Sequence, residues 1–329
     1  MLIEDSTRAG LKVAGAGALA VLGSGSTGNC TVVSFASSKN PAARSVVLID
    51  LGLSPRMTAA RLARVGVSMS EVSAVLLTHL DNDHCNPGWC GEGATALPEG
   101  CEVFLPRSWG RQAERMGVGA PAGGRLHTFS GYFRTRLGLG VQPTMQFHDA
   151  LGAAAFRLTL PGWGTGTDGA GTIGYATDLG RVTEELVAHL RGVSVLAIES
   201  NYCPKMQVSS TRPEFLKKRI MGGRGHLSNG QCLQAVRAIG PRDHVVLIHL
   251  SRECNRPEIA AELHAGAGYG LTVSAPFEPT GWIPVRGSEG GVGVGESDVV
   301  ARPRSVEVDA KITVTAGGSV EADREEVPA

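Results

Sequence analysis

The stretch Thr78-His79-Leu80-Asp81-Asn82-Asp83-His84 places four potential metal ligands within six residues. An apolar, strand-like run over 72–77 leads directly into it. Imidazole and carboxylate groups together suit Zn²⁺, Mn²⁺ or iron, and so many on one short loop can serve two ions. The alternative, a solvated acidic loop that happens to hold two histidines, is disfavoured because matching ligands recur far downstream.

Those downstream residues stand where other apolar runs end: His148, Asp178 and His249. Each alone would fit a core histidine or a turn or N-cap aspartate. Strands of one sheet deliver their ends to one edge, so the repetition predicts a shared site. The predicted ligands, enough for two ions about 3.5–4 Å apart with one bridging carboxylate, are His79, Asp81, Asp83, His84, His148, Asp178 and His249.

Length and composition favour one large domain with extensions. The chain has 329 residues, of which 42% are apolar, enough to bury a large core. We predict an N-terminal extension over 1–17, a main domain over 18–287 and a flexible, acidic, glycine-rich tail over 288–329. The tail holds nine acids and four bases, which leaves an excess of five positive charges in residues 1–287. That excess alone is too weak to indicate nucleic-acid binding.

Cysteine usage and hydropathy bear on the cell compartment. Seven cysteines are scattered without a CxxC pair, which favours reduced thiols in a cytoplasmic protein over a disulfide framework. No apolar run reaches the roughly 18–20 residues that span a bilayer, so no membrane association is expected. The apolar stretch 13–22 could be a signal sequence, but its passage into a Gly/Ser turn favours a first strand.

Hydrophobic periodicity indicates an α/β (α+β) chain. Strand-like runs occur at 18–22, 30–35, 45–49, 73–77, 102–105, 144–148, 153–160, 172–176, 193–198, 244–248 and 270–273. Helical patterns occur at 56–65, 107–116, 181–191, 213–221, 229–239 and 256–265. Strands dominate the first half in meander-like order, so we predict two mixed sheets flanked by helices rather than one doubly wound parallel sheet.

The motifs as a set resemble the metallo-β-lactamase-fold hydrolases, and among them the YycJ/WalJ-type group, with a more distant likeness to tRNase Z. They occur in the family's order over roughly residues 18–285. Beside the Thr78–His84 block, the motifs are GSGSTGNC at 23–30, LIDLG at 48–52, HDA at 148–150, ATDLG at 176–180, ESNY at 199–202, GHLSN at 225–229 and HLS at 249–251. The resemblance implies a four-layer αββα sandwich with a metal site at one edge.

The resemblance also implies roles for these residues. His79, Asp81 and His148 would hold one ion, Asp83, His84 and His249 the other, and Asp178 would bridge them. Asp83 would face a bridging water that serves as the hydroxide nucleophile, and Glu199 would orient His226 as the proton donor to the leaving oxygen. Substrate oxygens would be bound by Ser228, Asn229, Ser251 and Arg252, although an N-cap role fits the serines equally well. Structural support is expected from Asp50, which could equally be an ordinary turn residue, and from Asn29.

One position departs from the family pattern, which normally reads His-x-His-x-Asp-His. Asp81 stands where the second histidine is usual. A carboxylate is a harder, negatively charged donor, so it should weaken the first ion as a Lewis acid. It should also shift preference from the Zn²⁺ that the resemblance implies towards Mn²⁺ or Fe.

The sequence is compatible with four functions. The first is a dinuclear phosphodiesterase acting on DNA in the manner of an exonuclease. The second is a hydrolase of a small phosphodiester, an ester or a lactone. The third is a non-catalytic member with an altered metal site. The fourth, ranked last because no flavin-binding domain is visible, is a di-iron redox protein, since flavin-partnered relatives of the fold also place a carboxylate at the second ligand position.

Overall fold

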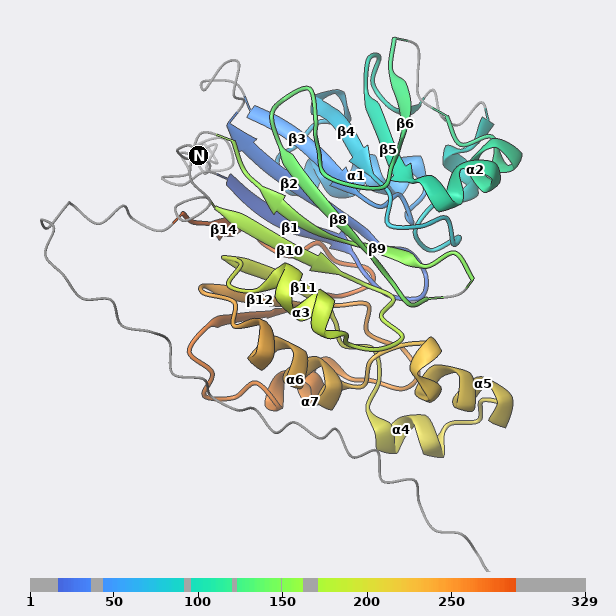
Figure 1. Ribbon diagram of the computed structural model, residues 1–329, viewed down its shortest axis with the longest axis vertical. Helices are drawn as coiled ribbons and strands as arrows, with labels where there is room; N and C mark the ends of the chain where they lie inside the picture. Colours follow the sequence, from blue (N-terminus) through green and yellow to red (C-terminus); the bar gives the residue numbers. More distant parts are fainter. Residues whose placement is uncertain are drawn as a thin grey trace, which may run out of the picture. The chain divides into compact units, whose positions relative to one another are not determined.

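The computed structural model describes residues 17–36, 44–91, 96–119, 123–148, 150–161 and 171–287. Apart from Gly17, which begins the first strand, the predicted N-terminal extension and acidic tail lie outside these residues. The described residues belong to one compact unit, within which two seven-stranded sheets pack face to face (Figure 1).

The first sheet has the strand order β14-β1-β2-β3-β4-β5-β6. Its strands are β1 (Gly17–Gly23), β2 (Cys30–Ala36), β3 (Arg44–Ile49), β4 (Val72–Leu76), β5 (Glu102–Pro106), β6 (Arg125–Phe129) and β14 (Ile283–Val285). Strands β3 to β6 run parallel, whereas β14, β1, β2 and β3 pair antiparallel. The carboxyl ends of β3 and β4 therefore meet at one edge of the sheet.

The second sheet has the order β13-β12-β11-β10-β9-β8-β7. Its strands are β7 (Phe133–Arg134), β8 (Gly140–Gln146), β9 (Ala153–Thr159), β10 (Thr172–Ala176), β11 (Val195–Glu199), β12 (His244–Ile248) and β13 (Gly270–Val273). Strands β10 to β13 are parallel, and β9 is antiparallel to both β8 and β10. Consequently β8 runs in the same direction as β10, and the two end at the same edge.

Helices cover both outer faces, which confirms the predicted αββα sandwich. The inner faces share one apolar core, exemplified by Val47 and Ile49 from the first sheet and Phe156 and Tyr175 from the second. A second core packs α1 (Pro55–Arg64) and α2 (Gly110–Met116) on the first sheet. A third packs α3 (Glu184–Leu190), α6 (Asn229–Ile239) and α7 (Pro257–Glu262) on the second. Alternate strand residues thus serve two different cores.

The structure also contains elements that the hydrophobic pattern did not predict. Strands β6, β7 and β14 and the helix α4 (Pro204–Ser209) were not expected. β6 is an edge strand whose side chains are mostly exposed or half-buried, so its apolar signal is weak. β8 begins four residues earlier than predicted, and it includes Pro143, which is opposite Phe156 of β9.

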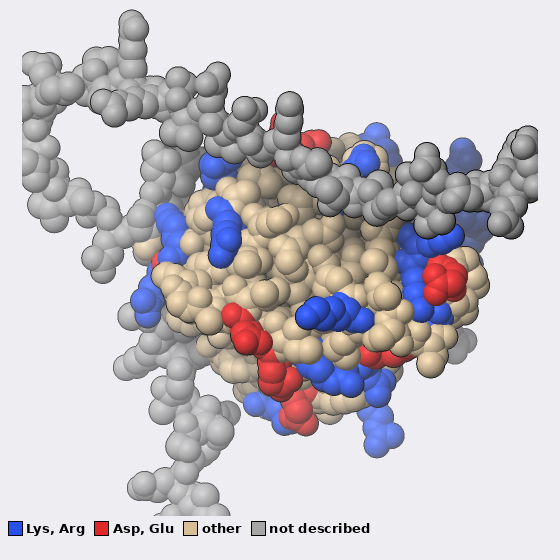
Figure 2. Space-filling model, turned by 90° about the horizontal axis from the view of Figure 1, so that it is seen from below, with Lys and Arg blue, Asp and Glu red and all other residues tan. Residues whose placement is uncertain are grey.

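One segment projects from the second sheet between β11 and α6. It comprises α4, α5 (Glu214–Arg219) and the irregular turn Ile220–Arg224, and we call residues 204–224 the arm. A small core of its own, which includes Tyr202, Ile220 and Cys254, holds it to the domain. Blue side chains lie around a red patch at the right-hand end of Figure 2, the end at which α4 and α5 lie in Figure 1.

Candidate metal centre

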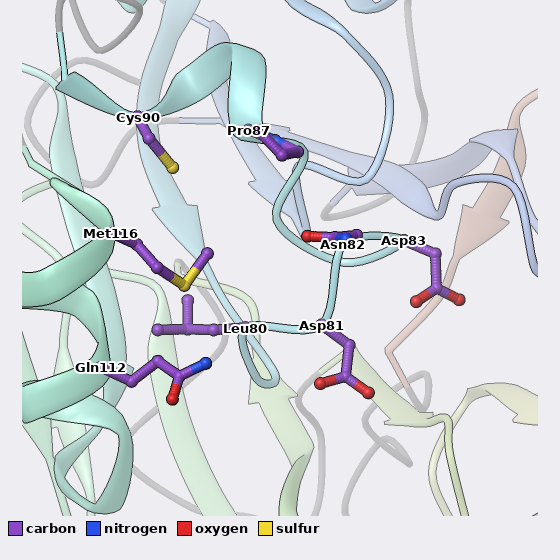
Figure 3. Close-up of a pocket in the computed structure, with 8 residues that line it drawn as sticks. All are labelled: Leu80, Asp81, Asn82, Asp83, Pro87, Cys90, Gln112 and Met116. Atoms are coloured by element: carbon purple, nitrogen blue, oxygen red, sulfur yellow. The ribbon is translucent and has the colours of Figure 1, made fainter.

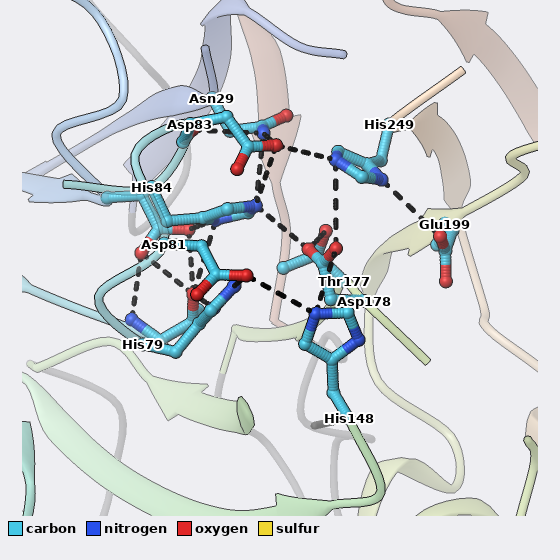
Figure 4. Close-up of polar contacts among 12 residues, drawn as sticks. Asn29, His79, Asp81, Asp83, His84, His148, Thr177, Asp178, Glu199 and His249 are labelled. Atoms are coloured by element: carbon cyan, nitrogen blue, oxygen red, sulfur yellow. Dashed lines mark hydrogen bonds and ion pairs between the residues drawn. The ribbon is translucent and has the colours of Figure 1, made fainter. Parts of the chain in front are cut away.

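The predicted ligands converge at one edge of the sandwich, because the strands that carry them all end there. Asp178 lies two residues beyond β10, and His249 directly follows β12. His148 lies two residues beyond β8, and the block from His79 to His84 follows β4. Figure 4 shows these side chains pointing toward one another from both sheets.

Three groups of possible metal donors lie at this edge among the described residues, and one of them joins Asp178 with Glu199, His226 and His249. The other two match the predicted ligands. The ligand atoms of His79, His148 and Asp178 all lie within 4.8 Å of one another, and so do those of Asp83, His84 and His249. Asp178 lies close to histidines of both groups: Oδ1 is 3.8 Å from His148 Nε2 and 3.7 Å from His249 Nε2, and Oδ2 is 2.8 Å from His84 Nε2. This is the arrangement expected of a carboxylate that bridges two cations.

Asp81, the departure from the family pattern, also points into the first group. Its Oδ2 lies 3.7 Å from His79 Nε2 and 3.7 Å from His148 Nε2. The side chain is 38% exposed, far more than the two histidines that it faces. A second carboxylate, that of Asp81, therefore lies beside the first group on its solvent side.

Carboxylates support the outer nitrogens of the second group's histidines. Asp50, fully buried, lies with Oδ2 2.7 Å from His84 Nδ1, and it also accepts hydrogen bonds from the backbone N–H and the hydroxyl of Thr78. Glu199, also fully buried, lies with Oε1 3.3 Å from His249 Nδ1. Such contacts fix the ring orientation and tautomer of a metal-binding histidine.

Glu199 also contacts the predicted proton donor. The same Oε1 lies 2.6 Å from His226 Nδ1, and Oε2 accepts a 2.7 Å hydrogen bond from the Leu179 N–H. His226 is partly exposed, with 21% of its side chain accessible, whereas Glu199 is fully buried. The structure thus brings His226 and Glu199 together as predicted, and shows that one carboxylate serves both His226 and His249.

Backbone conformation marks the same residues. Among the described residues, the non-glycine residues with positive φ are Asp50, Asp178 and His249, at 63°, 53° and 57°. Each directly follows a strand or lies two residues beyond it, and each belongs to the ligand cluster or contacts it. Left-handed backbone is unfavourable for such residues and tends to be retained at functional sites.

The pKa values of two neighbouring histidines in the cluster are shifted in opposite directions. Burial, reinforced by the neighbouring His84, lowers the pKa of His79 to about 3. Burial also disfavours charged His84, but Asp178, Asp50 and Asp83 outweigh this effect and hold its pKa well above the usual value.

The donor set fits divalent cations. His79 Nε2 is buried without a hydrogen-bond partner, although it faces the carboxylate of Asp81 at 3.7 Å. Buried polar atoms are rarely left unsatisfied, so this nitrogen suits a metal bond. Mixed imidazole and carboxylate donors are the ligands of Zn²⁺, Mn²⁺ and iron in proteins.

Asn29, predicted as structural support, lies beside the second group. Its side-chain amide nitrogen lies 3.1 Å from His84 Nε2 and donates to the Asp83 carbonyl at 3.1 Å, while its Oδ1 accepts from the Ser24 hydroxyl at 2.8 Å. Ser24 Oγ in turn accepts a 2.8 Å hydrogen bond from the His249 N–H. The glycine-rich loop after β1 therefore ties the His84 and His249 segments together.

The four predicted substrate-binding residues have different surroundings. Ser228 forms a capping box with Gln231 at the start of α6, which is the N-cap alternative left open by the sequence. Asn229 and Ser251 are buried with internal hydrogen bonds, to Ser200 and Asn255 and to Arg212 and Cys254 respectively. Arg252 is exposed, with its guanidinium 4.9 Å from the Phe277 ring centre. Substrate contact by these four residues stays a prediction.

Sequence reasoning overlooked two threonines. Thr78 Oγ1 lies 3.0 Å from His79 Nδ1, and Thr177 donates a 2.7 Å hydrogen bond to Asp178 Oδ2. Each directly precedes a predicted ligand at the end of a strand, and that repeated Thr-ligand pair was a signal available in the sequence.

A cavity of about 640 Å³ opens beside the ligand loop (Figure 3). Asp81 and Asp83 line the side toward the metal centre, while Gln112 and Met116 of α2 line the opposite side. The remaining lining residues are Leu80, Asn82, Pro87 and Cys90. This volume lies within the usual range for small-ligand sites.

Two further observations concern the cysteines and the apolar character of the helices. All seven cysteines are free thiols. None of the described helices combines the length and apolar composition that a bilayer-spanning helix needs.

Comparisons with known proteins place this site in a family context. Residues 46–250 match the family model described as the beta-lactamase superfamily domain. The exodeoxyribonuclease WalJ of Streptococcus pneumoniae serotype 2 is 26% identical over 244 residues, 73% of this chain and 84% of that protein. The exodeoxyribonuclease YycJ of Bacillus anthracis is 26% identical over 242 residues, with the same coverage. These matches confirm the resemblance drawn from the motifs.

Solved structures share the fold. The metallo-beta-lactamase fold protein YhfI from Bacillus subtilis superposes with a TM-score of 0.59 at 13% identity, covering 80% of this chain and 99% of that chain. A diphosphatase from the PhnP family superposes with a TM-score of 0.56 at 14% identity, covering 82% and 98%.

Proposed function

We propose that this chain, which belongs to the beta-lactamase superfamily, is a metal-dependent phosphodiesterase that shortens DNA from an end. The observation that carries the proposal is the convergence of two donor groups on Asp178, with the His226–Glu199 pair beside them. The relatives named as exodeoxyribonucleases support DNA as the substrate.

His79, Asp81 and His148 would hold one divalent cation, Asp83, His84 and His249 the other, and Asp178 would contact both. When bound, the two cations would polarise the phosphodiester and lower the pKa of an attacking water. The donors suit Zn²⁺, as the family resemblance implies. The hard carboxylate of Asp81 favours Mn²⁺ or Fe at the first position.

The protein's own groups would orient the reaction and move the proton. Asp83 Oδ2, 3.3 Å from His249 Nε2, lies at the exposed side of the second group, where it can accept a hydrogen bond from the attacking water. Glu199 fixes His226 through Nδ1 and leaves Nε2 toward solvent. As the bond from phosphorus to the leaving oxygen breaks, His226 would donate its Nε2 proton to that oxygen.

Among the four residues predicted to bind substrate, Arg252 is the one we favour for a phosphate oxygen. Its side chain is exposed, whereas Ser228, Asn229 and Ser251 already have hydrogen-bond partners within the protein. A guanidinium can bind two phosphate oxygens at once. The other three would hold the loops around the site.

A second candidate is the hydrolysis of a small phosphodiester. The cavity of about 640 Å³ beside Asp81 and Asp83 favours it, because its walls combine the apolar Met116 with the amide of Gln112. A small ligand needs just such a mixture of apolar surface and a few polar groups.

Four substrates distinguish these functions: single-stranded DNA, duplex DNA, bis-p-nitrophenyl phosphate and a lactone, each with Mn²⁺ or Zn²⁺ added. We expect release of mononucleotides from DNA and slower hydrolysis of the nitrophenyl ester. Hydrolysis of the ester with no attack on either DNA would favour the small-phosphodiester candidate. Turnover of the lactone alone would contradict both.

The variant His226→Ala tests the proton donor. We expect DNA hydrolysis to fall about 10²–10⁴-fold with metal content unchanged. Hydrolysis of the nitrophenyl ester should fall much less, since p-nitrophenolate leaves without a proton. The half-buried His127 of β6 provides the control variant His127→Ala, which should act on both substrates like the unaltered protein. Loss of metal from His226→Ala would instead make His226 a ligand.

A further inference from the structure

The arm, residues 204–224, carries the excess positive charge of the domain. It holds six bases, Lys205, Arg212, Lys217, Lys218, Arg219 and Arg224, against one acid, Glu214. Residues 1–287 contain 27 bases and 22 acids, so the arm's balance of +5 equals that of the whole range. The rest of residues 1–287 is therefore neutral, and the excess that is too weak on its own to indicate nucleic-acid binding is concentrated in one segment.

One face of α5 combines an exposed aromatic ring with cations. Phe215 is 74% exposed. Lys218 and Arg219 are also exposed, and their i+3 and i+4 spacing places them on the same helical face as Phe215. Leu216 and Ile220 instead pack into the small core that holds the arm. The outward ring is thus not part of a core, and together with the neighbouring cations it offers a surface that a ligand can contact.

The arm joins two parts of the metal centre along the chain. It begins five residues after Glu199 and ends two residues before His226. Its C-terminal end packs on Gly180, two residues beyond Asp178: a Cβ at Gly180 would lie 2.8 Å from the Gly223 carbonyl oxygen and 3.0 Å from Arg224 Cα. A polymer bound along the arm would therefore lead toward the proton donor and the bridging carboxylate.

We propose that the arm binds single-stranded nucleic acid next to the end that is cleaved. Phe215 would stack on an unpaired base, and Lys218 would contact the phosphate backbone of the nucleic acid. The inference rests on the proposed function and extends it to the polymer beyond the cleaved bond. Phosphates complement the local charge, and an exposed ring stacks on a base that is not already paired. An acidic protein partner would also match the charge, but the position of the arm beside the metal centre, where Gly223 packs on Gly180, favours the polymer that the site would cleave.

Binding without turnover tests the arm separately from catalysis. Fluorescence anisotropy would follow a labelled single-stranded oligonucleotide and its duplex on the full-length chain carrying Asp178→Asn, which keeps the DNA uncut. On this background we expect Phe215→Ala to weaken single-strand binding about tenfold. Lys218→Ala should reduce the slope of log affinity against log salt by about one. Control variants are Tyr132→Ala, another exposed ring, and Arg237→Ala, an exposed base of α6.

Hydrolysis of bis-p-nitrophenyl phosphate by the otherwise unaltered chain reports on the metal centre alone. Phe215→Ala and Lys218→Ala should hydrolyse it at the normal rate but degrade single-stranded DNA with a raised KM. An inactive metal centre would refute the proposed function yet leave the anisotropy result informative about the arm. Binding by the two arm variants equal to that of the controls would overturn the inference.

Discussion

The two halves of the metal centre differ in how the protein supports them. In the second group, His84 and His249 each have a buried carboxylate at the outer nitrogen, from Asp50 at 2.7 Å and from Glu199 at 3.3 Å. In the first group, the outer nitrogen of His79 faces the neutral hydroxyl of Thr78 at 3.0 Å. A carboxylate strengthens an imidazole as a metal ligand more than a hydroxyl does.

The departure from the family pattern falls in the less supported half. Asp81 is 38% exposed, while the carboxylates that orient the second group are fully buried. We infer that the second group retains its ion more tightly and that the first group sets metal preference. On the proposed assignment, the replacement of histidine by Asp81 would change which metal the first group prefers. Asp178 and the second group would still bind their ions.

The largest effect is expected where the two halves meet. Asp178→Asn removes the charge that both groups share while preserving the side-chain shape. We expect hydrolysis of bis-p-nitrophenyl phosphate to fall below detection and metal content, measured by mass spectrometry, to drop in both halves. The exposed Asp243, next to β12, offers the control variant Asp243→Asn. Full activity in Asp178→Asn would show that the carboxylate does not bridge.

Much of the candidate metal centre could be predicted because the end of a strand can be recognised in the sequence, as the point where an apolar run stops. Apolar runs end in His79, His148, Asp178 and His249, and the structure brings these four side chains together. The same reasoning anticipated the two sheets, since most strands carry continuous buried runs. It missed β6 and α4, where exposed residues or a proline obscure the period.

The supporting contacts could not be predicted, since they join segments that only the fold places side by side. Glu199 was expected to orient His226, yet its contact with His249 depends on the parallel pairing of β11 with β12. Asn229, predicted to bind substrate, donates a hydrogen bond to Asn255, which lies 26 residues further along the chain. Polar residue type alone does not show whether a side chain faces the site or the core.

Support of the second group is testable through Asp50. The variant Asp50→Asn leaves a neutral amide beside His84 Nδ1, so the imidazole loses its charged partner. We expect the affinity for the second ion to fall about 10–100-fold, with the first ion much less affected. Titration with Zn²⁺ followed by calorimetry would measure both sites. A thermal melt of the metal-free variant checks that it is folded, and equal losses at the two sites would contradict the asymmetry.

The smallest change restores the family pattern in the first group. Asp81→His exchanges a hard carboxylate for imidazole at 3.7 Å from the Nε2 atoms of His79 and His148. We expect Zn²⁺ to bind the first group about tenfold more tightly relative to Mn²⁺. The second group should not change, because Asp50 and Glu199 still orient its histidines. Competition between the two ions, read by metal analysis after dialysis, measures this ratio. If the preference did not move, Asp81 would not be a ligand, and the departure from the family pattern would have to act through the adjoining cavity that Asp81 also lines.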